Sequence, residues 1–482
     1  MDTTRSTSVT NADPAAPAAA PATATPAAGP AAGTQVTAPA RTRRSLIWGG
    51  LVLGMGPTLD GGRAPVNLGA EHAALVLGPP RSGKTSSIVV PSILEAPAAV
   101  VSTSTKGDVL QATYPWRSRF GVCYVFDPTG SVALPRGAVE LRWSPISGCE
   151  DFEAANAMAY ALANAAAPAG ERGEGAHWVE RAEALLAPLL HAAATAGCDM
   201  ADVCRWVLGH DVREPEAILA ASGALMAKVL LSSIWRTEER ERSGIFSTAA
   251  RLLSAYRSDR ALQAACRPNF DPHGFAAGTD TLYICAPAHA QEQLTPLVVA
   301  LLEQIRAALY MRRARYADSA PMVFALDEVA NIAPLPSLPQ LAAEGAGQGL
   351  VTLACLQDLS QARARWGAQA EGFFSIFSVK IVLPGIGDPR TLDLLSALGG
   401  DVQVPVESVS RPPAYALLLG KGQPTSSTTT SYVWRRRLPV DQIAQGRPGS
   451  ALCVMPGRPL ESVMVVPWWE VPRWRSRVLG ES

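Results

Sequence analysis

Eight consecutive residues, GPPRSGKT at 78–85, fit the phosphate-binding pattern G-x-x-x-x-G-K-[ST]. The glycines of this pattern let backbone N–H groups turn inward and surround phosphate oxygens. Lys84 would reach the β- and γ-phosphates, and the Thr85 hydroxyl would bind Mg²⁺. The chain has only five lysines, so a lysine at this place argues against an ordinary glycine-rich turn. The predicted cofactors are ATP and Mg²⁺, and the predicted nucleotide-binding residues are Gly78, Pro79, Pro80, Arg81, Ser82, Gly83, Lys84 and Thr85.

Two further polar positions follow apolar runs and could complete a hydrolysis site. Asp327 and Glu328 come directly after the run at 322–326, where Asp327 would hold the Mg²⁺ water shell and Glu328 would polarise the attacking water. Gln357 follows the run at 350–356 and would sense the γ-phosphate, beside Asp327 in the sheet. The alternatives are a strand that enters a loop at 327–328 and a solvated loop glutamine at 357. The predicted catalytic residues are therefore Lys84, Glu328 and Gln357, and the predicted metal residues are Thr85 and Asp327.

Short apolar runs, separated by helical segments, must position these side chains. They lie at 73–77, 98–102, 123–126, 281–285, 322–326, 350–356 and 379–383. Strands that recur with helices between them indicate a parallel α/β sheet. Residues 151–256 are instead rich in Ala, Leu, Glu and Arg, with apolar side chains at helical spacing. We predict a nucleotide-binding domain in two parts, 45–149 and 276–482, interrupted by an all-α domain at 150–275.

Composition excludes several classes of protein. Of the 482 residues, 48% are hydrophobic and 17% charged, which excludes a mainly disordered or fibrous chain. The net charge is +0, so any contact with nucleic acid must be local. Eight scattered cysteines without a C-x-x-C pair favour reduced thiols over a disulfide or zinc framework.

The start of the chain is predicted to be a disordered tail at 1–44, because its Ala, Pro and Thr residues bury too little surface to fold. The apolar run at 46–55 is much shorter than the roughly 20 residues that span a bilayer. It is interpreted as a strand that enters the core, with an interfacial anchor as the alternative. No other segment is expected to span a membrane.

These motifs, in this order, resemble those of the type IV secretion coupling proteins of the TraG/TraD kind. The resemblance runs from about residue 51 to 469, and its anchors are EHAALVLGPPRSGKT, VVSTSTKGDVL, YVFDP, WSPI, FALDEVANIAPLPSLPQLAAEGAGQG, LQDLSQARARWG and KIVLPGIGDPRTLDLLSALGG. It implies a RecA-like P-loop ATPase core with an inserted all-α domain for substrate docking. It also implies a homohexamer that pumps single-stranded DNA with its relaxase. The implied partners are the relaxosome, the secretion-channel ATPases and inner-membrane proteins.

Three departures from the family pattern bear on function. Ser104 replaces the usual first Asp of a D-P-K-G-E motif, while Lys106 and an acid at 108 are kept. Ala346 stands where the family usually has a finger arginine, so hydrolysis is slow unless Arg363, Arg365 or Arg390 substitutes; each could instead be a surface or salt-bridge residue. The family's N-terminal membrane pair is not recognised, so a partner is expected to hold the chain at the cytoplasmic face of the plasma membrane.

Three functions remain open. The first is a motor that hydrolyses ATP and drives DNA to the secretion channel. The second is a nucleotide-gated docking receptor that recruits substrate with little hydrolysis, for which Ala346 is the motive. The third is an FtsK-like DNA translocase, which the all-α block and the sequence after Gln357 disfavour.

Overall fold

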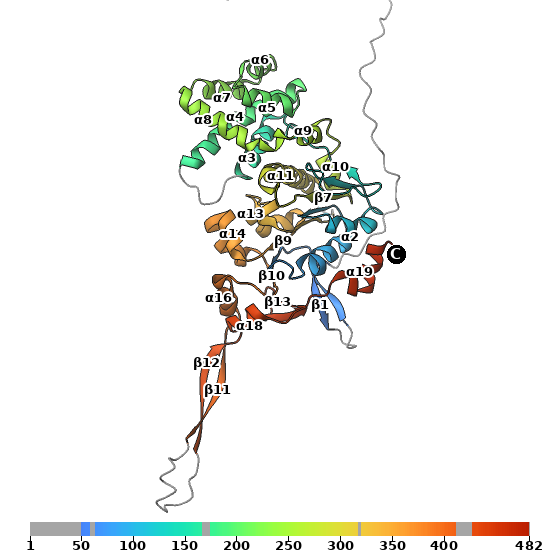
Figure 1. Ribbon diagram of the computed structural model, residues 1–482, viewed down its shortest axis with the longest axis vertical. Coiled ribbons are helices and arrows are strands. Elements are labelled where there is room, and N and C mark those ends of the chain that lie inside the picture. The colour runs from blue at the N-terminus through green and yellow to red at the C-terminus, as the bar shows by residue number, and fades with distance from the viewer. Residues whose placement is uncertain (1–49, 58–62, 166–173, 317–319, 411–426, 482) are drawn as a thin grey trace, which may run out of the picture. The chain divides into compact units, whose positions relative to one another are not determined.

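A 12-stranded sheet organises the part of the chain that the computed structural model describes, which comprises residues 50–57, 63–165, 174–316, 320–410 and 427–481 (Figure 1). These residues belong to the unit Arg41–Ser482, and the predicted tail at 1–44 lies outside them. The strand order is β2-β1-β14-β13-β10-β3-β9-β8-β4-β7-β5-β6. The strands are β1 Leu51–Pro57, β2 Arg63–Leu68, β3 Ala74–Leu77, β4 Val100–Ser104, β5 Cys123–Phe126, β6 Val139–Glu140, β7 Thr281–Cys285, β8 Met322–Leu326, β9 Leu350–Leu356, β10 Val379–Val382, β13 Ser450–Val454 and β14 Glu461–Met464.

The strands from β10 to β6 pair in parallel, and β2, β1, β14, β13 and β10 pair antiparallel. The central strands are buried along their whole length, as expected for parallel strands covered on both faces. Alternate side chains enter two separate cores: Leu75 and Leu77 enter one, and Ala74 and Val76 the other. The predicted α/β class with a mainly parallel sheet is confirmed.

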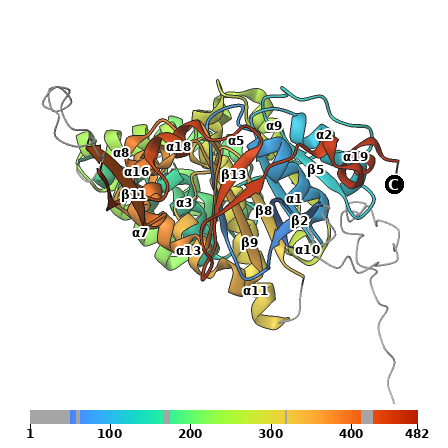
Figure 2. The same cartoon turned by 90° about the horizontal axis from the view of Figure 1, so that it is seen from below.

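Helices cover both faces of this sheet. One core is closed by α1 Val90–Glu95, α2 Asp108–Arg117 and α19 Pro472–Leu479, and Figures 1 and 2 both show α19 beside α2. The helices that close the other core are α11 Gln291–Arg315, α12 Val329–Ile332, α13 Leu338–Glu344, α14 Leu359–Trp366, α15 Phe373–Ile376, α16 Pro389–Leu398 and α18 Val440–Gln445.

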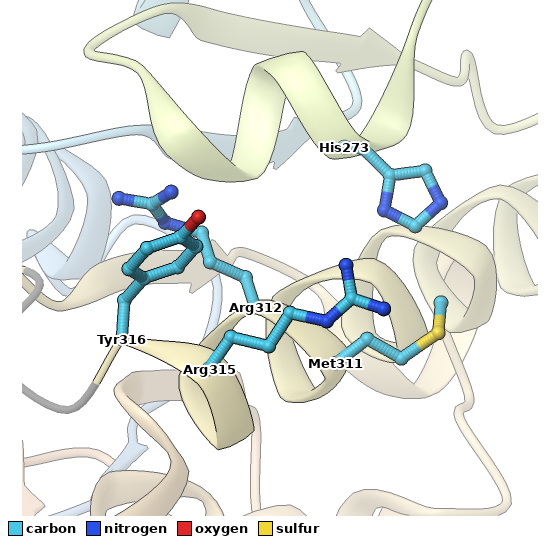
Figure 3. Close-up of a pocket in the computed structure, with 5 residues that line it drawn as sticks. All are labelled: His273, Met311, Arg312, Arg315 and Tyr316. Carbon is cyan, nitrogen blue, oxygen red and sulfur yellow. The ribbon is translucent and has the colours of Figure 1, made fainter.

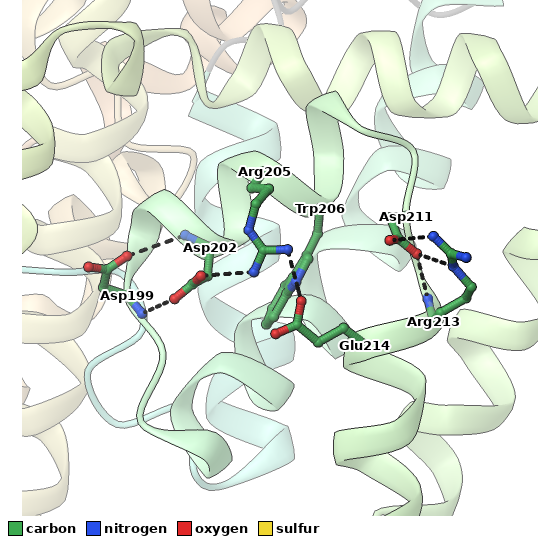
Figure 4. Close-up of polar contacts among 7 residues, drawn as sticks. All are labelled: Asp199, Asp202, Arg205, Trp206, Asp211, Arg213 and Glu214. Atoms are coloured by element: carbon green, nitrogen blue, oxygen red, sulfur yellow. Dashed lines mark hydrogen bonds and ion pairs between the residues drawn. The ribbon is translucent and has the colours of Figure 1, made fainter.

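The predicted all-α block consists of α3 Phe152–Ala165, α4 Glu174–Ala196, α5 Met200–Leu208, α6 Arg213–Ala221, α7 Leu225–Trp235, α8 Glu239–Leu252 and α9 Asp259–Ala265, followed by α10 Pro272–Ala277. Its apolar side chains join the same core as α11. A polar network links α5 to α6: Arg205 donates to Asp202 (2.9 Å) and Glu214 (2.8 Å), and the buried Trp206 indole also donates to Glu214 (2.9 Å) (Figure 4). Asp199 caps α5 by accepting from the backbone of Ala201.

Two apolar segments bear on the question of membrane contact, namely helix α11 and the run at 46–55. Helix α11 is long and apolar enough to cross a membrane, contrary to the expectation that no segment is, but 67% of its most apolar window is buried inside the protein. It is thus a core helix, contacting α3, α10 and α12. Of the run at 46–55, the described part belongs to β1, which forms an antiparallel hairpin with β2 at the sheet edge.

A second hairpin, β11 Asp401–Ser410 with β12 Ser427–Arg436, forms a separate two-stranded sheet among the described residues. Almost all of its side chains are exposed.

Candidate nucleotide-binding site

The phosphate-binding loop connects β3 to a helical segment that begins at Thr85 and continues into α1. The Gly78 amide donates to the Leu356 carbonyl (3.1 Å), which ties the loop to β9. Gly83 has φ +93°, a left-handed conformation that glycine adopts without steric cost. Arg81 adopts φ +65° without that freedom, so the loop holds a conformation that an unconstrained chain would avoid.

Lys84 and Ser82 present polar groups to the inside of this loop. The Lys84 side chain is 6% exposed, and its ammonium donates to the carbonyl oxygens of Gly78 and Pro79, the latter at 3.1 Å. The Ser82 hydroxyl is buried and has no hydrogen-bond partner among the described residues. A buried orphan hydroxyl and an ammonium in one concave loop fit a phosphate group, which can accept a hydrogen bond from each.

Thr85 and Asp327, the predicted metal residues, lie in contact although 242 positions separate them. The Thr85 hydroxyl donates to Asp327 Oδ2 (2.6 Å), and the Thr103 hydroxyl donates to the Asp327 carbonyl (2.7 Å). Asp327 is 7% exposed, and burial raises the pKa of its carboxyl, which the Thr85 hydrogen bond partly opposes. A hydroxyl and a carboxylate side by side are oxygen ligands of the kind that Mg²⁺ prefers.

Glu328 lines the same cavity as the loop. Its backbone is left-handed (φ +51°, ψ +46°), which is unfavourable for a residue with a β-carbon. Asn331, one turn later in α12, donates to Glu328 Oε2 (3.2 Å) and orients the carboxylate. The structure thus places a carboxylate in the cavity, and its role as the base stays a prediction.

Gln357 lies at the end of β9, which is placed between β3 and β8, so the expected neighbourhood with Asp327 is present. Its backbone amide donates to the Gln361 side chain (2.9 Å). Gln357 does not line the nucleotide cavity formed by the described residues. Its role as γ-phosphate sensor stays a prediction.

The cavity above the loop has a volume of about 820 Å³. It is lined by residues 80–86, by Val90, by Ser104, Thr105, Lys106, Asp108, Gln111 and Ala112, by Asp327 and Glu328, and by Trp468, Trp469 and Val478. The two tryptophans were not predicted to belong to this site. They are adjacent in the sequence, but no local pattern connects them to a loop almost 400 positions earlier.

The stretch after β4 explains the Ser104 departure. The Ser104 hydroxyl accepts from the Lys106 amide (3.2 Å) and donates to Asp108 Oδ1 (3.1 Å). Asp108 also accepts from the Val109 amide at the start of α2 (2.9 Å). Ser104 therefore closes the turn that presents Lys106 to the cavity; a carboxylate at this position could accept from the Lys106 amide but could not donate to Asp108.

None of the three candidate finger arginines lines the nucleotide cavity of the described chain. Arg363 forms an ion pair with Asp388 (2.8 Å), which also caps α16. Arg363 is therefore a salt-bridge residue in this structure, which is the alternative to a finger arginine. Arg365 is half-buried and Arg390 is exposed. Ala346 lies in the short 3₁₀ turn Gly345–Gln348 between α13 and β9.

A second cavity of about 190 Å³ lies at the end of α11 and is lined by His273, Met311, Arg312, Arg315 and Tyr316 (Figure 3). The Arg312 guanidinium stacks over the Tyr316 ring, with 5.3 Å between its carbon and the ring centroid. Arg312 Nε is buried without a hydrogen-bond partner among the described residues. This cavity therefore brings two arginine side chains together. A local group of cations of this kind is what an anion-binding protein with a net charge of zero needs.

Comparisons with known proteins agree with this geometry. A family model described as type IV secretory system conjugative DNA transfer matches residues 36–447. Two conjugal transfer proteins TraG of Escherichia coli are 26% and 25% identical over 334 residues, which is 62% of this chain and 50% of each relative. The chain thus spans about half the length of the curated relatives it matches.

Solved structures of the plasmid coupling protein TrwB share the fold. The unbound TrwBΔN70 form has a TM-score of 0.63 at 18% identity and covers 85% of this chain and 88% of its own. The complex of TrwB with ADP and Mg²⁺ has a TM-score of 0.62 at 18% identity, with 85% and 89% covered. The complex with a non-hydrolysable ATP analogue has 0.62 at 18% identity, with 83% and 86% covered.

Proposed function

The chain belongs to the type IV secretory system conjugative DNA transfer family, and on this premise we propose that it is an ATP-driven motor that moves single-stranded DNA to a secretion channel. The observation that carries the proposal is the contact of Thr85 with Asp327 beneath a loop that holds Lys84. That arrangement brings a phosphate cradle and a metal-binding carboxylate to one cavity of about 820 Å³, within the usual range for ligand sites.

The residues of the site divide the work of hydrolysis. Lys84 neutralises charge on the terminal phosphates, and the loop amides hold the same group in place. Thr85 and Asp327 would hold Mg²⁺, which when bound polarises phosphate oxygens. Glu328, oriented by Asn331, accepts a proton from the attacking water. TrwB structures of the same fold hold ADP with Mg²⁺, an ATP analogue and a GTP analogue, which supports a purine nucleotide as the ligand here, and ATP is the one we propose.

The partners follow from family membership and are part of the same proposal. We expect a homohexamer that works with a relaxosome, with channel ATPases and with inner-membrane proteins at the cytoplasmic face of the plasma membrane. The cavity at the end of α11 suits DNA phosphates, because its lining residues include two guanidiniums and no acid.

Two variants test the motor against the docking receptor that Ala346 suggests. Lys84→Ala should abolish ATP binding, hydrolysis and DNA transfer in either case. Glu328→Gln should keep ATP binding in both cases, but it abolishes transfer only if hydrolysis drives the process. Transfer that survives in Glu328→Gln cells would exclude the motor and favour the receptor. Purified wild-type protein without ATPase activity, even with single-stranded DNA and at high protein concentration, would also count against the motor.

A further inference from the structure

Trp468 and Trp469 form an aromatic wall of the nucleotide cavity. They lie in a 3₁₀ turn, Trp468–Glu470, that precedes α19. Trp468 is half-buried and packs against the core that also holds α1, whereas Trp469 is 49% exposed. Their ring centroids are 5.4 Å apart at an interplanar angle of 83°, an edge-to-face contact in which Trp468 supports Trp469.

This wall is fastened to the helix that continues from the phosphate-binding loop. Glu95, the last residue of α1, accepts from Arg473 (2.6 Å), Trp474 (3.0 Å) and Arg477 (2.8 Å) of α19. Arg477 also donates to the Leu94 carbonyl (3.0 Å). The helix that continues from the phosphate-binding loop is therefore bound directly to the helix that follows the aromatic wall.

The residues that line the cavity offer two chemistries that a nucleotide needs. The loop residues, Lys84 and the Thr85–Asp327 pair suit a phosphate chain with its cation. Val478 and the two indoles, which line the same cavity, suit a flat and weakly polar group. A half-exposed indole inside a cavity loses the rest of its contact with water when an aromatic ring stacks on it, which stabilises the complex.

We propose that Trp469, supported by Trp468, is the platform on which the purine base of the bound nucleotide stacks. This rests on the proposed function, because the phosphate cradle places the base. Stacking on an indole selects a purine over a pyrimidine by contact area and does not distinguish adenine from guanine. Base–aromatic stacking contributes roughly 1–3 kcal/mol, which corresponds to a change of about 5- to 150-fold in affinity at 1.4 kcal/mol per tenfold.

Calorimetric titration of the full chain with ATP and, separately, with inorganic tripolyphosphate tests this assignment. Trp469→Ala should weaken ATP binding by about 5- to 150-fold and leave tripolyphosphate binding unchanged. Trp469→Phe should retain most of the ATP affinity, because a smaller aromatic face remains. Trp434→Ala is the matched control, since that indole is 64% exposed on β12 and does not line the cavity.

The possible outcomes distinguish a failure of the stacking platform from a failure of the proposed function. If the wild type binds both ligands and Trp469→Ala binds ATP as tightly as the wild type, the platform is refuted and the proposed function stands. Equal weakening of ATP and tripolyphosphate in Trp469→Ala also refutes it, because the indole then only supports the loop. If the wild-type protein binds neither ligand, the proposed function fails, and the platform fails with it.

Discussion

Removal of the Glu95 carboxylate should release α19 from α1. The Glu95 and Arg477 side chains are 12% and 9% exposed, so their ion pair is largely buried. Burial lowers the pKa of the Arg477 guanidinium, and Glu95 opposes that effect. Loss of one partner of a buried pair costs about 3–5 kcal/mol, because the other charge is left uncompensated. Arg477 would keep the Leu94 carbonyl and the face of the Trp116 ring, 4.5 Å from its guanidinium carbon. We therefore expect Glu95→Ala to lower the free energy of opening α19 by about 3 kcal/mol, the lower end of that range.

Native-state hydrogen exchange measures this effect locally, which matters because so large a chain need not unfold in two states. A loss of about 3 kcal/mol should accelerate exchange of the α19 amides roughly 100-fold. Arg473→Ala is the control: its side chain is 56% exposed, so its pair with the same carboxylate should contribute only about 0.2–1 kcal/mol. Exchange in Glu95→Ala within a few-fold of the wild type, or an equal effect of Arg473→Ala, would show that the buried pair does not hold the helix. Glu95→Leu combined with Arg477→Met should restore much of the protection, because no unpaired charge remains.

Three further predictions address the metal site, the helical block and the DNA contact. Thr85→Val should abolish the strengthening of ATP binding by Mg²⁺, because the hydroxyl beside Asp327 is lost; calorimetry with and without Mg²⁺ that shows the same gain as the wild type would contradict this. Arg205 lowers the pKa of its two carboxylate partners through hydrogen bonds, so the stability it provides is present above about pH 4–5 and disappears as pH falls through the lowered values; the thermal midpoints of wild type and Arg205→Met should differ at pH 7 and approach each other as the pH falls through those lowered values. The double change Arg312→Ala and Arg315→Ala should make the slope of log K against log salt for single-stranded DNA less negative by about 1–2, and an unchanged slope would remove these residues from the DNA site.

The strands and the loop could be predicted because their signals are local. The runs at 281–285, 322–326 and 350–356 coincide with β7, β8 and β9, since parallel strands buried on both faces are continuously apolar. The phosphate-binding pattern likewise lies within eight residues, and each position has its own steric or chemical requirement.

The antiparallel side of the sheet and the aromatic wall were not predictable in the same way. β14 pairs with β1 through Met55 and Met464, and β13 pairs with β10, so the far end of the chain completes a sheet begun near residue 51. Glu95, an unremarkable acid in the sequence, and the Leu94 carbonyl link α19 to the loop helix. Such contacts depend on the order of strands in space, which the periodicity of a single segment does not contain.

The helical block is inserted at a point in the fold where it does not interrupt the strands that carry the nucleotide site. The block leaves the sheet after the edge strand β6 and returns through α10 to β7, on the opposite side of β4 from β8, β9 and β3. Its contact with the site runs through α11, which packs against α3. In α11 the Thr295 hydroxyl shares its proton between the carbonyls of Gln291 (2.7 Å) and Asn331 (3.0 Å), and the Asn331 side chain donates to Glu328 (3.2 Å). The contact between α11 and α12 therefore lies next to the hydrogen bond that orients the proposed base. Glu328 is the strained residue among these contacts, because its left-handed backbone is unfavourable for a residue with a β-carbon.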